Sequence, residues 1–187
     1  MSREWCFAEL TQEQAAKKGD LRMIALKIED LKTFTAQLFM GETFDYWLVR
    51  EANIVTFNSF TIDGRIRQGY YSDEELETNR IEEFSSWKTL RPFCYSLIRG
   101  KKLPESFQIT LQLSPEENEK FIRRVKPDLP ADQIAALYLN IRYENHAAAC
   151  VTGTSLKIFM LDKQIEQEWD ETVRRYFRKL QIPCVEV

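Results

Sequence analysis

Basic residues that stand together without interleaved acids are the first candidates for chemistry in this chain. Such groups create a local positive potential even where the net charge is −3, and that potential suits an anionic partner such as nucleic acid or a phosphorylated ligand. Bases near the ends of helices also compensate the helix dipole, so a joint anion site requires the two groups to meet in space. The two clusters are Arg99, Lys101 and Lys102, and Arg123, Arg124 and Lys126.

A weaker candidate for anion binding is the segment Thr152-Gly153-Thr154-Ser155 with Lys157 two residues on. Hydroxyl groups and backbone N–H groups at a glycine turn can hold a phosphate. The spacing differs from GxxxxGK[ST], however, so an ordinary hairpin turn is the favoured interpretation. Thr152, Thr154, Ser155 and Lys157 therefore remain secondary candidates.

Residues of the types that build catalytic or metal sites are few and scattered. His146 is the only histidine, and no nucleophile or base stands beside it in a recognisable pattern. The four cysteines are far apart without a CxxC pair, which argues against a zinc site and favours reduced thiols in a cytoplasmic protein. We therefore predict no catalytic residues, no metal and no cofactor. The cysteines are Cys6, Cys94, Cys150 and Cys184.

The length and composition predict one compact domain. A chain of 187 residues with 44% hydrophobic residues can bury one good core, and no apolar run is long enough to cross a membrane. Residues 1–22 are polar and differ in composition from the rest of the chain. Lys17-Lys18-Gly19-Asp20 can be encoded by a purine run like a ribosome-binding site, so we expect Met23 to be the native start. The leader 1–22 is then dispensable, and the domain covers residues 23–187.

A long amphipathic helix near the C-terminus is the strongest structural signal. Its acids stand in the early turns and its bases in the late turns, which complements the helix dipole. Asp162 is the expected N-cap and Pro183 ends the segment. A buried strand, 156–161, is expected before it. The predicted stripe consists of Ile165, Trp169, Val173, Tyr176, Phe177 and Leu180.

The remaining elements predict an α+β fold made of two βαβββ halves. Two helices, over 73–84 and from Leu90 to Gly100, separate the halves. This element order is similar to that of a DNA sliding-clamp domain, with ordinary α+β packing as the alternative. In the first half the elements are a strand at 24–28, a helix from Asp30, and strands at 44–50, 54–62 and 65–71, with Asp63-Gly64 as the turn. In the second they are a strand at 107–113, a helix opened by Ser114-Pro115-Glu116-Glu117, and strands at 137–143, 148–151 and 156–161.

Three motifs resemble an uncharacterised family of small bacterial proteins, a domain of unknown function. They are FTIDGRI at Phe60–Ile66, LRPF with LIRGKKLP within Leu90–Pro104, and VTGTSLKIF with DKQIEQEWD within Val151–Asp170. The resemblance begins at Met23 and excludes the leader. It implies a bacterial, cytoplasmic protein and transfers no catalytic residue.

Two classes of function remain open from the sequence. A non-enzymatic binding or scaffold module is the first choice, because no nucleophile, base and oxyanion set stands out. An enzyme acting on a phosphorylated or carboxylated small molecule is the alternative. A deep pocket joining Arg91, Arg99 or Lys157 to a carboxylate would favour the enzyme, whereas a flat apolar or basic surface would favour the binding module.

Overall fold

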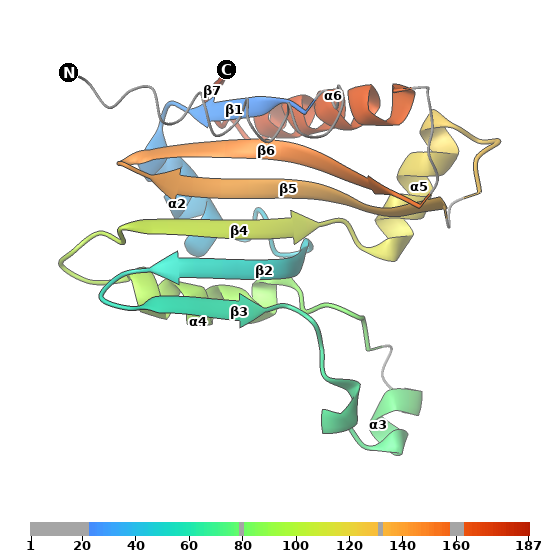
Figure 1. The fold of residues 1–187 in the computed structure, drawn as a ribbon, viewed down its shortest axis with the longest axis horizontal. Helices are drawn as coiled ribbons and strands as arrows, with labels where there is room; N and C mark the ends of the chain where they lie inside the picture. The colour runs from blue at the N-terminus through green and yellow to red at the C-terminus, as the bar shows by residue number, and fades with distance from the viewer. Residues whose placement is uncertain (1–22, 79–80, 131–132, 158–162) are drawn as a thin grey trace.

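One seven-stranded sheet forms the centre of the protein, and every neighbouring pair of its strands is antiparallel (Figure 1). The computed structural model describes residues 23–78, 81–130, 133–157 and 163–187. The strand order is β3-β2-β4-β5-β6-β1-β7. The strands are β1 (Ala25–Ile28), β2 (Leu48–Val55), β3 (Ser59–Asp63), β4 (Ser106–Gln112), β5 (Ile134–Glu144), β6 (Ala147–Leu156) and β7 (Cys184–Glu186).

The larger helices pack on one face of this sheet, which is the face turned away from the viewer in Figure 1. The opposite face carries polar side chains, among them Gln108, Thr110 and Asn140. The prediction of an α+β fold is therefore confirmed. The helices are α2 (Leu31–Phe39), α3 (Asp73–Thr78), α4 (Trp87–Ile98), α5 (Pro115–Val125) and α6 (Gln164–Lys179), with a 3₁₀ turn, η1, at Gln68–Tyr70.

Alternation in β4 and β5 produces the two-sided sheet. Phe107, Ile109 and Leu111 are buried towards the helices, whereas the residues between them are more exposed, with Gln112 as a buried exception. Strand β5 continues into β6 through a two-residue turn at Asn145 and His146, which both have positive φ. Two left-handed residues suit a tight hairpin. The predicted strand at 107–113 is confirmed as β4.

The first half of the chain differs from the three-stranded meander that the sequence predicted. Only β2 and β3 form there, and their hairpin turn lies at 56–58 rather than at Asp63-Gly64. Beyond β3, Arg65 forms an isolated bridge with Phe84, and the chain then enters η1. The predicted strand at 65–71 was therefore wrong. Aromatic and β-branched content was mistaken for a continuous ladder.

Gly64 serves close packing rather than a hairpin turn. Its amide donates to the carbonyl of Arg50, and its carbonyl accepts from the amide of Ser85, so three chain segments meet here. A Cβ at this position would lie 1.8 Å from the carbonyl oxygen of Val49. No side chain fits at that distance, so glycine is required by the approach of the backbones.

Capping residues set the starts of three helices. Ser72 and Glu75 form a capping box at α3, and the side chain of Ser114 accepts from the amide of Glu117 at α5. The α4 helix begins at Trp87, three residues earlier than the predicted Leu90, because Ser86 caps it. Pro92 therefore lies past the first turn of α4. The predicted helix over 73–84 was too long: α3 covers Asp73–Thr78, and residues 81–84 are not helical.

The predicted pseudo-repeat is not confirmed by the pairing of the strands. Among the described residues each half shows the order βαββ instead of βαβββ. Strands β4, β5 and β6 are neighbours, whereas β1 lies apart from β2 and β3 at the other side of the sheet. The pseudo-repeat and the likeness to a clamp therefore stay unconfirmed. The leader 1–22, the Asp162 cap and most of the predicted strand 156–161 lie outside the described residues.

The segment Thr152-Gly153-Thr154-Ser155 is not the turn that the sequence predicted. All four residues lie in β6 and pair with β5, as Thr152 does with Leu139. Gly153 does not have a positive φ. These residues are extended because β6 continues well beyond Val151. The backbone N–H groups of a turn are therefore not present to hold a phosphate here.

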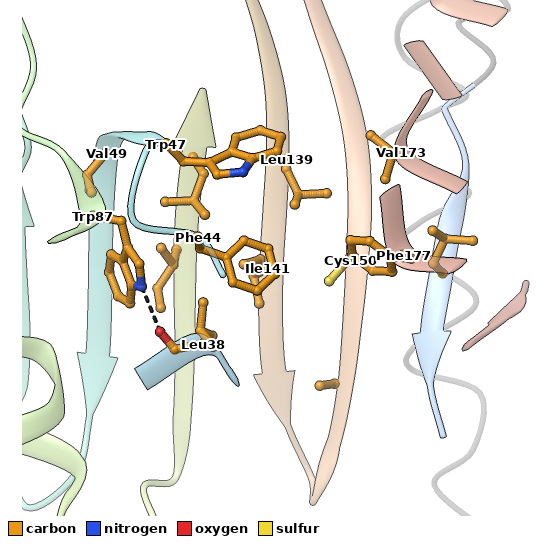
Figure 2. Close-up of a cluster of buried hydrophobic side chains, with 14 of the residues drawn as sticks. Leu38, Phe44, Trp47, Val49, Trp87, Leu139, Ile141, Cys150, Val173 and Phe177 are labelled. Atoms are coloured by element: carbon orange, nitrogen blue, oxygen red, sulfur yellow. Dashed lines mark hydrogen bonds between the residues drawn. The ribbon is translucent and has the colours of Figure 1, made fainter. Parts of the chain in front are cut away.

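The core fills the space between the sheet and the helices (Figure 2). Trp87 is fully buried, and its indole N–H donates to the carbonyl of Leu38 at 2.7 Å. The α6 stripe is confirmed: four members are buried, and Tyr176 and Leu180 are partly buried. Figure 2 shows Val173 and Phe177 of α6 beside Cys150 of β6. Helix α6 is therefore held to the sheet by one continuous apolar face.

Candidate binding groove

A groove of about 420 Å³ lies between α5 and α6 and is closed at its base by the chain that enters β2. Helix α5 packs against both α6 and β5, which fixes its distance from the sheet. Aromatic and aliphatic side chains form most of the lining, and polar side chains stand at the rim. The lining residues are Trp47, Leu113, Glu117, Lys120, Phe121, Arg124, Trp169, Thr172, Val173 and Tyr176.

Aromatic rings from α5, α6 and the segment before β2 meet at the base of the groove. The Trp47 ring centroid lies 6.1 Å from Trp169 and 5.9 Å from Tyr176. Phe121 of α5 meets Trp169 edge to face, with the centroids 5.7 Å apart. Trp47 is 8% exposed and Trp169 is 2% exposed, so the rings mainly shape the groove and offer it only part of their surface.

Hydrogen bonds hold these rings in place. The Tyr176 hydroxyl donates to the carbonyl of Thr43 at 2.6 Å and accepts from the Trp47 indole N–H at 3.4 Å. The Trp169 indole N–H donates to the carbonyl of Tyr138 at 3.0 Å. Burial raises the pKa of Tyr176 above its ordinary value, and the Trp47 hydrogen bond opposes that shift. Tyr176 therefore stays a neutral hydroxyl that ties α6 to the chain before β2.

Two cations of α5 stand at the rim in different surroundings. Lys120 pairs with Glu117 at 2.8 Å and with Glu116 at 2.9 Å, and these hydrogen bonds raise the pKa of its ammonium group. The Arg124 guanidinium lies over the Phe121 ring, 5.4 Å from its centroid. Lys120 is thus neutralised locally, whereas Arg124 is positioned by an uncharged ring.

The two predicted basic clusters lie at opposite ends of the sheet. Strand β4 runs between them: the loop after Arg99 enters β4 at Ser106, and α5 begins after β4 ends at Gln112 (Figure 1). Lys101 and Lys102 are in that loop. The clusters do not form one surface, and the anion-binding role of each remains a prediction. Arg123 pairs with Glu119 on its own helix, so Arg124 is the member that reaches the groove.

The weaker anion candidates also have structural surroundings of their own. Thr152 is 1% exposed; its hydroxyl donates to Asp170 at 2.5 Å and accepts from the amide of Ile24. Burial raises the pKa of Asp170, while the Thr152 hydrogen bond lowers it. Thr154 and Ser155 follow in β6, and the amide of Lys157 donates to the carbonyl of Gln133. Thr152 therefore joins α6 to Ile24, the residue before β1, inside the protein.

Arg91 does pair with a carboxylate, that of Asp45, but this ion pair does not line the groove. Arg91 and Asp45 form an ion pair at 3.1 Å, with side chains that are 16% and 6% exposed. This pair joins α4 to the segment before β2 and does not line the groove. In the part of the chain that the structure describes, no group of three or more His, Cys, Asp or Glu residues could hold a metal ion.

Sequence comparison agrees with the motif resemblance. Residues 37–184 match the family of unknown function DUF5721, and all the groove residues fall within that range. The chain belongs to this family. Comparisons with curated proteins and with solved structures give no match. Among the helices that the structure describes, none is long and apolar enough to cross a membrane.

Reasoning from the sequence found only part of this groove. It selected Arg124 among the bases and placed Trp169, Val173 and Tyr176 on the inward face of α6. It missed Trp47, because that residue was placed inside an expected strand. The spacing of α5 alone offered one further signal: Glu117, Lys120, Phe121 and Arg124 follow at three-residue and four-residue intervals and so share one side of the helix.

Proposed function

We propose that the protein is a non-enzymatic binding module that holds an apolar anchor side chain of a protein partner in the groove between α5 and α6. The observation that carries this proposal is the preformed apolar groove, whose rings are fixed by hydrogen bonds before any partner arrives. A rigid site loses little conformational entropy on binding, so its contacts contribute more fully to affinity.

The size and surface of the groove favour a protein segment over a free small molecule. A small ligand normally buries most of its own surface in a pocket. Here the rings of Trp47, Phe121 and Trp169 are 8%, 5% and 2% exposed, so the apolar area offered is limited. A protein segment can place one side chain in the groove and gain further contacts on α5 and α6 outside it.

The groove lacks the arrangement that an enzyme would need. Among its lining residues, the titratable groups are Glu117, Lys120, Arg124 and Tyr176. Glu117 and Lys120 neutralise one another, and the Tyr176 hydroxyl is engaged with Thr43. No lining residue pairs a nucleophile with a base, which supports binding rather than catalysis.

The surroundings of the groove support an acidic partner, as expected from the basic clusters. Arg124 offers a positive charge at the rim, and charge complementarity raises both association rate and specificity.

We place the protein in the bacterial cytoplasm, which agrees with its family resemblance and with the free thiols of Cys94, Cys150 and Cys184. A single domain over 23–187 is part of the same proposal.

Selection of peptides from a random display library against the full chain tests this function. We expect enriched peptides to share one large apolar residue next to Asp or Glu. Leu113→Gln, which places an amide in the groove, should weaken their binding about tenfold. The matched control is Leu103→Gln, since Leu103 is 69% exposed and outside the groove. Failure to enrich any motif, or equal binding to both variants, would refute the groove as the binding site.

A further inference from the structure

We propose that Arg124, Arg175 and Thr172 form an oxyanion subsite at the rim of the groove, and that this subsite binds a phosphate group on the ligand. The inference rests on the proposed function, because it names the acidic group that accompanies the apolar anchor. The Arg124 Nη2 atom lies 3.4 Å from Thr172 Oγ1, and the Arg175 Nη2 atom lies 3.3 Å from the same oxygen. Two guanidinium groups from two helices therefore converge on one hydroxyl.

The positive charge at this point is only weakly compensated by the protein. Among the described residues Arg124 has no carboxylate partner, and the nearest acid to Arg175 is Glu168 at 3.9 Å. Neighbouring arginines are paired more closely: Arg123 meets Glu119, and Arg178 meets Glu171 at 3.0 Å. Two like charges held near one another repel, so an anion that binds between them relieves an unfavourable interaction.

The three side chains supply the donors that a phosphate needs. Each guanidinium has further N–H groups beyond the one directed at Thr172, and its planar fork matches the oxygens of a phosphate. The Thr172 hydroxyl accepts from both arginines and keeps its own hydrogen as a donor. Two cations together match the double negative charge of a phosphate better than the single charge of a carboxylate.

The nearby acids do not cancel this potential. Glu117 is engaged with Lys120, which also meets Glu116. Glu168 is half exposed and lies at the limit of ion-pair distance from Arg175. The stacking of Arg124 on Phe121 and the position of Thr172 in the groove lining place the subsite directly beside the apolar anchor site. One ligand can therefore occupy both.

Calorimetric titration with 1-naphthyl phosphate and with 1-naphthol separates the two parts of the site. Both probes offer an aromatic ring, and only one offers a phosphate. We expect 1-naphthyl phosphate to bind at least tenfold more tightly, and Arg124→Gln or Arg175→Gln to remove most of that advantage. The matched controls are Arg123→Gln and Arg178→Gln, each one to three residues away on the same helix, which should leave the binding within twofold.

Equal affinity for the two probes, or equal losses in the Arg124 and Arg123 variants, would overturn the subsite. If both probes bind equally and Leu113→Gln weakens both, the groove stands and only the phosphate subsite fails. If neither probe binds, the subsite is refuted, and the peptide selection decides the proposed function independently. Inorganic phosphate that displaces 1-naphthyl phosphate but not 1-naphthol would support the assignment.

Discussion

The two basic clusters of this protein each contain three arginine or lysine residues but have different structural support. At the groove end, the Arg124 guanidinium rests on the Phe121 ring and reaches Thr172 of a second helix. At the opposite end, Lys101 and Lys102 are exposed in a loop, and among the described residues no ion pair or side-chain hydrogen bond holds them. Charge alone does not distinguish the clusters.

This difference shows that a basic side chain is a good candidate for binding a ligand when contacts with the protein hold it in place, and that its charge alone is not enough. A loop lysine must lose conformational freedom when it meets a ligand, whereas a stacked arginine has already lost much of it. The groove end is also built on the core through Trp169 and Tyr176, while the loop end is not. Variants at the two ends should therefore differ in stability as well as in binding.

The largest effect is expected from Trp169→Ala at the groove end. Trp169 is 2% exposed, touches Trp47 and Phe121, and donates to the carbonyl of Tyr138. Its truncation should lower the free energy of unfolding by about 3 to 5 kcal/mol. Urea denaturation measures this loss. The control Tyr46→Ala, at a residue that is 92% exposed, should cost less than about 0.5 kcal/mol, and similar losses in the two variants would contradict the described packing.

An intermediate effect is expected from Tyr176→Phe. The ring and its contacts remain, but the hydroxyl that joins the carbonyl of Thr43 to the Trp47 indole is lost. The free energy of unfolding should fall by about 1 kcal/mol, and binding in the groove should weaken because Trp47 is less well held. Tyr70→Phe is the control, since Tyr70 is 85% exposed. An unchanged unfolding midpoint for Tyr176→Phe would show that the hydroxyl does not join the two segments.

The smallest effect is expected at the loop end. The double variant Lys101→Gln, Lys102→Gln removes two solvated charges and should change the free energy of unfolding by less than about 0.5 kcal/mol. Its affinity for 1-naphthyl phosphate should equal that of the unaltered chain. Urea denaturation and calorimetric titration check both statements. A loss of affinity comparable to that of Arg124→Gln would mean that the loop end, too, takes part in binding anions.

The sequence predicts the elements of this fold well where one face is buried. The stripe of α6 and the alternation of β4 identify their buried sides, because helical and strand periodicity directly reflect contact with the core. Local capping signals at Ser72 and Ser114 also identify helix starts. The first half was less predictable, since the role of Gly64 depends on the approach of Val49, which no local pattern reveals.

The groove was only partly predictable for a related reason. Trp47 meets Tyr176 although they are far apart in the sequence, and Thr172 receives hydrogen bonds from both α5 and α6. Such contacts depend on how α5 and α6 lie on the sheet, and no periodicity or motif in the sequence indicates them. The prediction of a phosphate-holding turn was wrong for the opposite reason. The local pattern at Thr152 to Ser155 suggested a turn, but these residues pair with β5 and belong to strand β6.

The place of β1 in the sheet has a consequence for the order in which the protein is made. Leu26 of β1 pairs with Cys150 of β6 on one side and with Glu186 of β7 on the other. During synthesis β1 leaves the ribosome before either partner exists, whereas β4, β5 and β6 follow one another closely. Both backbone edges of the nascent β1 therefore stay unpaired until β6 has been translated, and its outer edge stays unpaired until β7 follows.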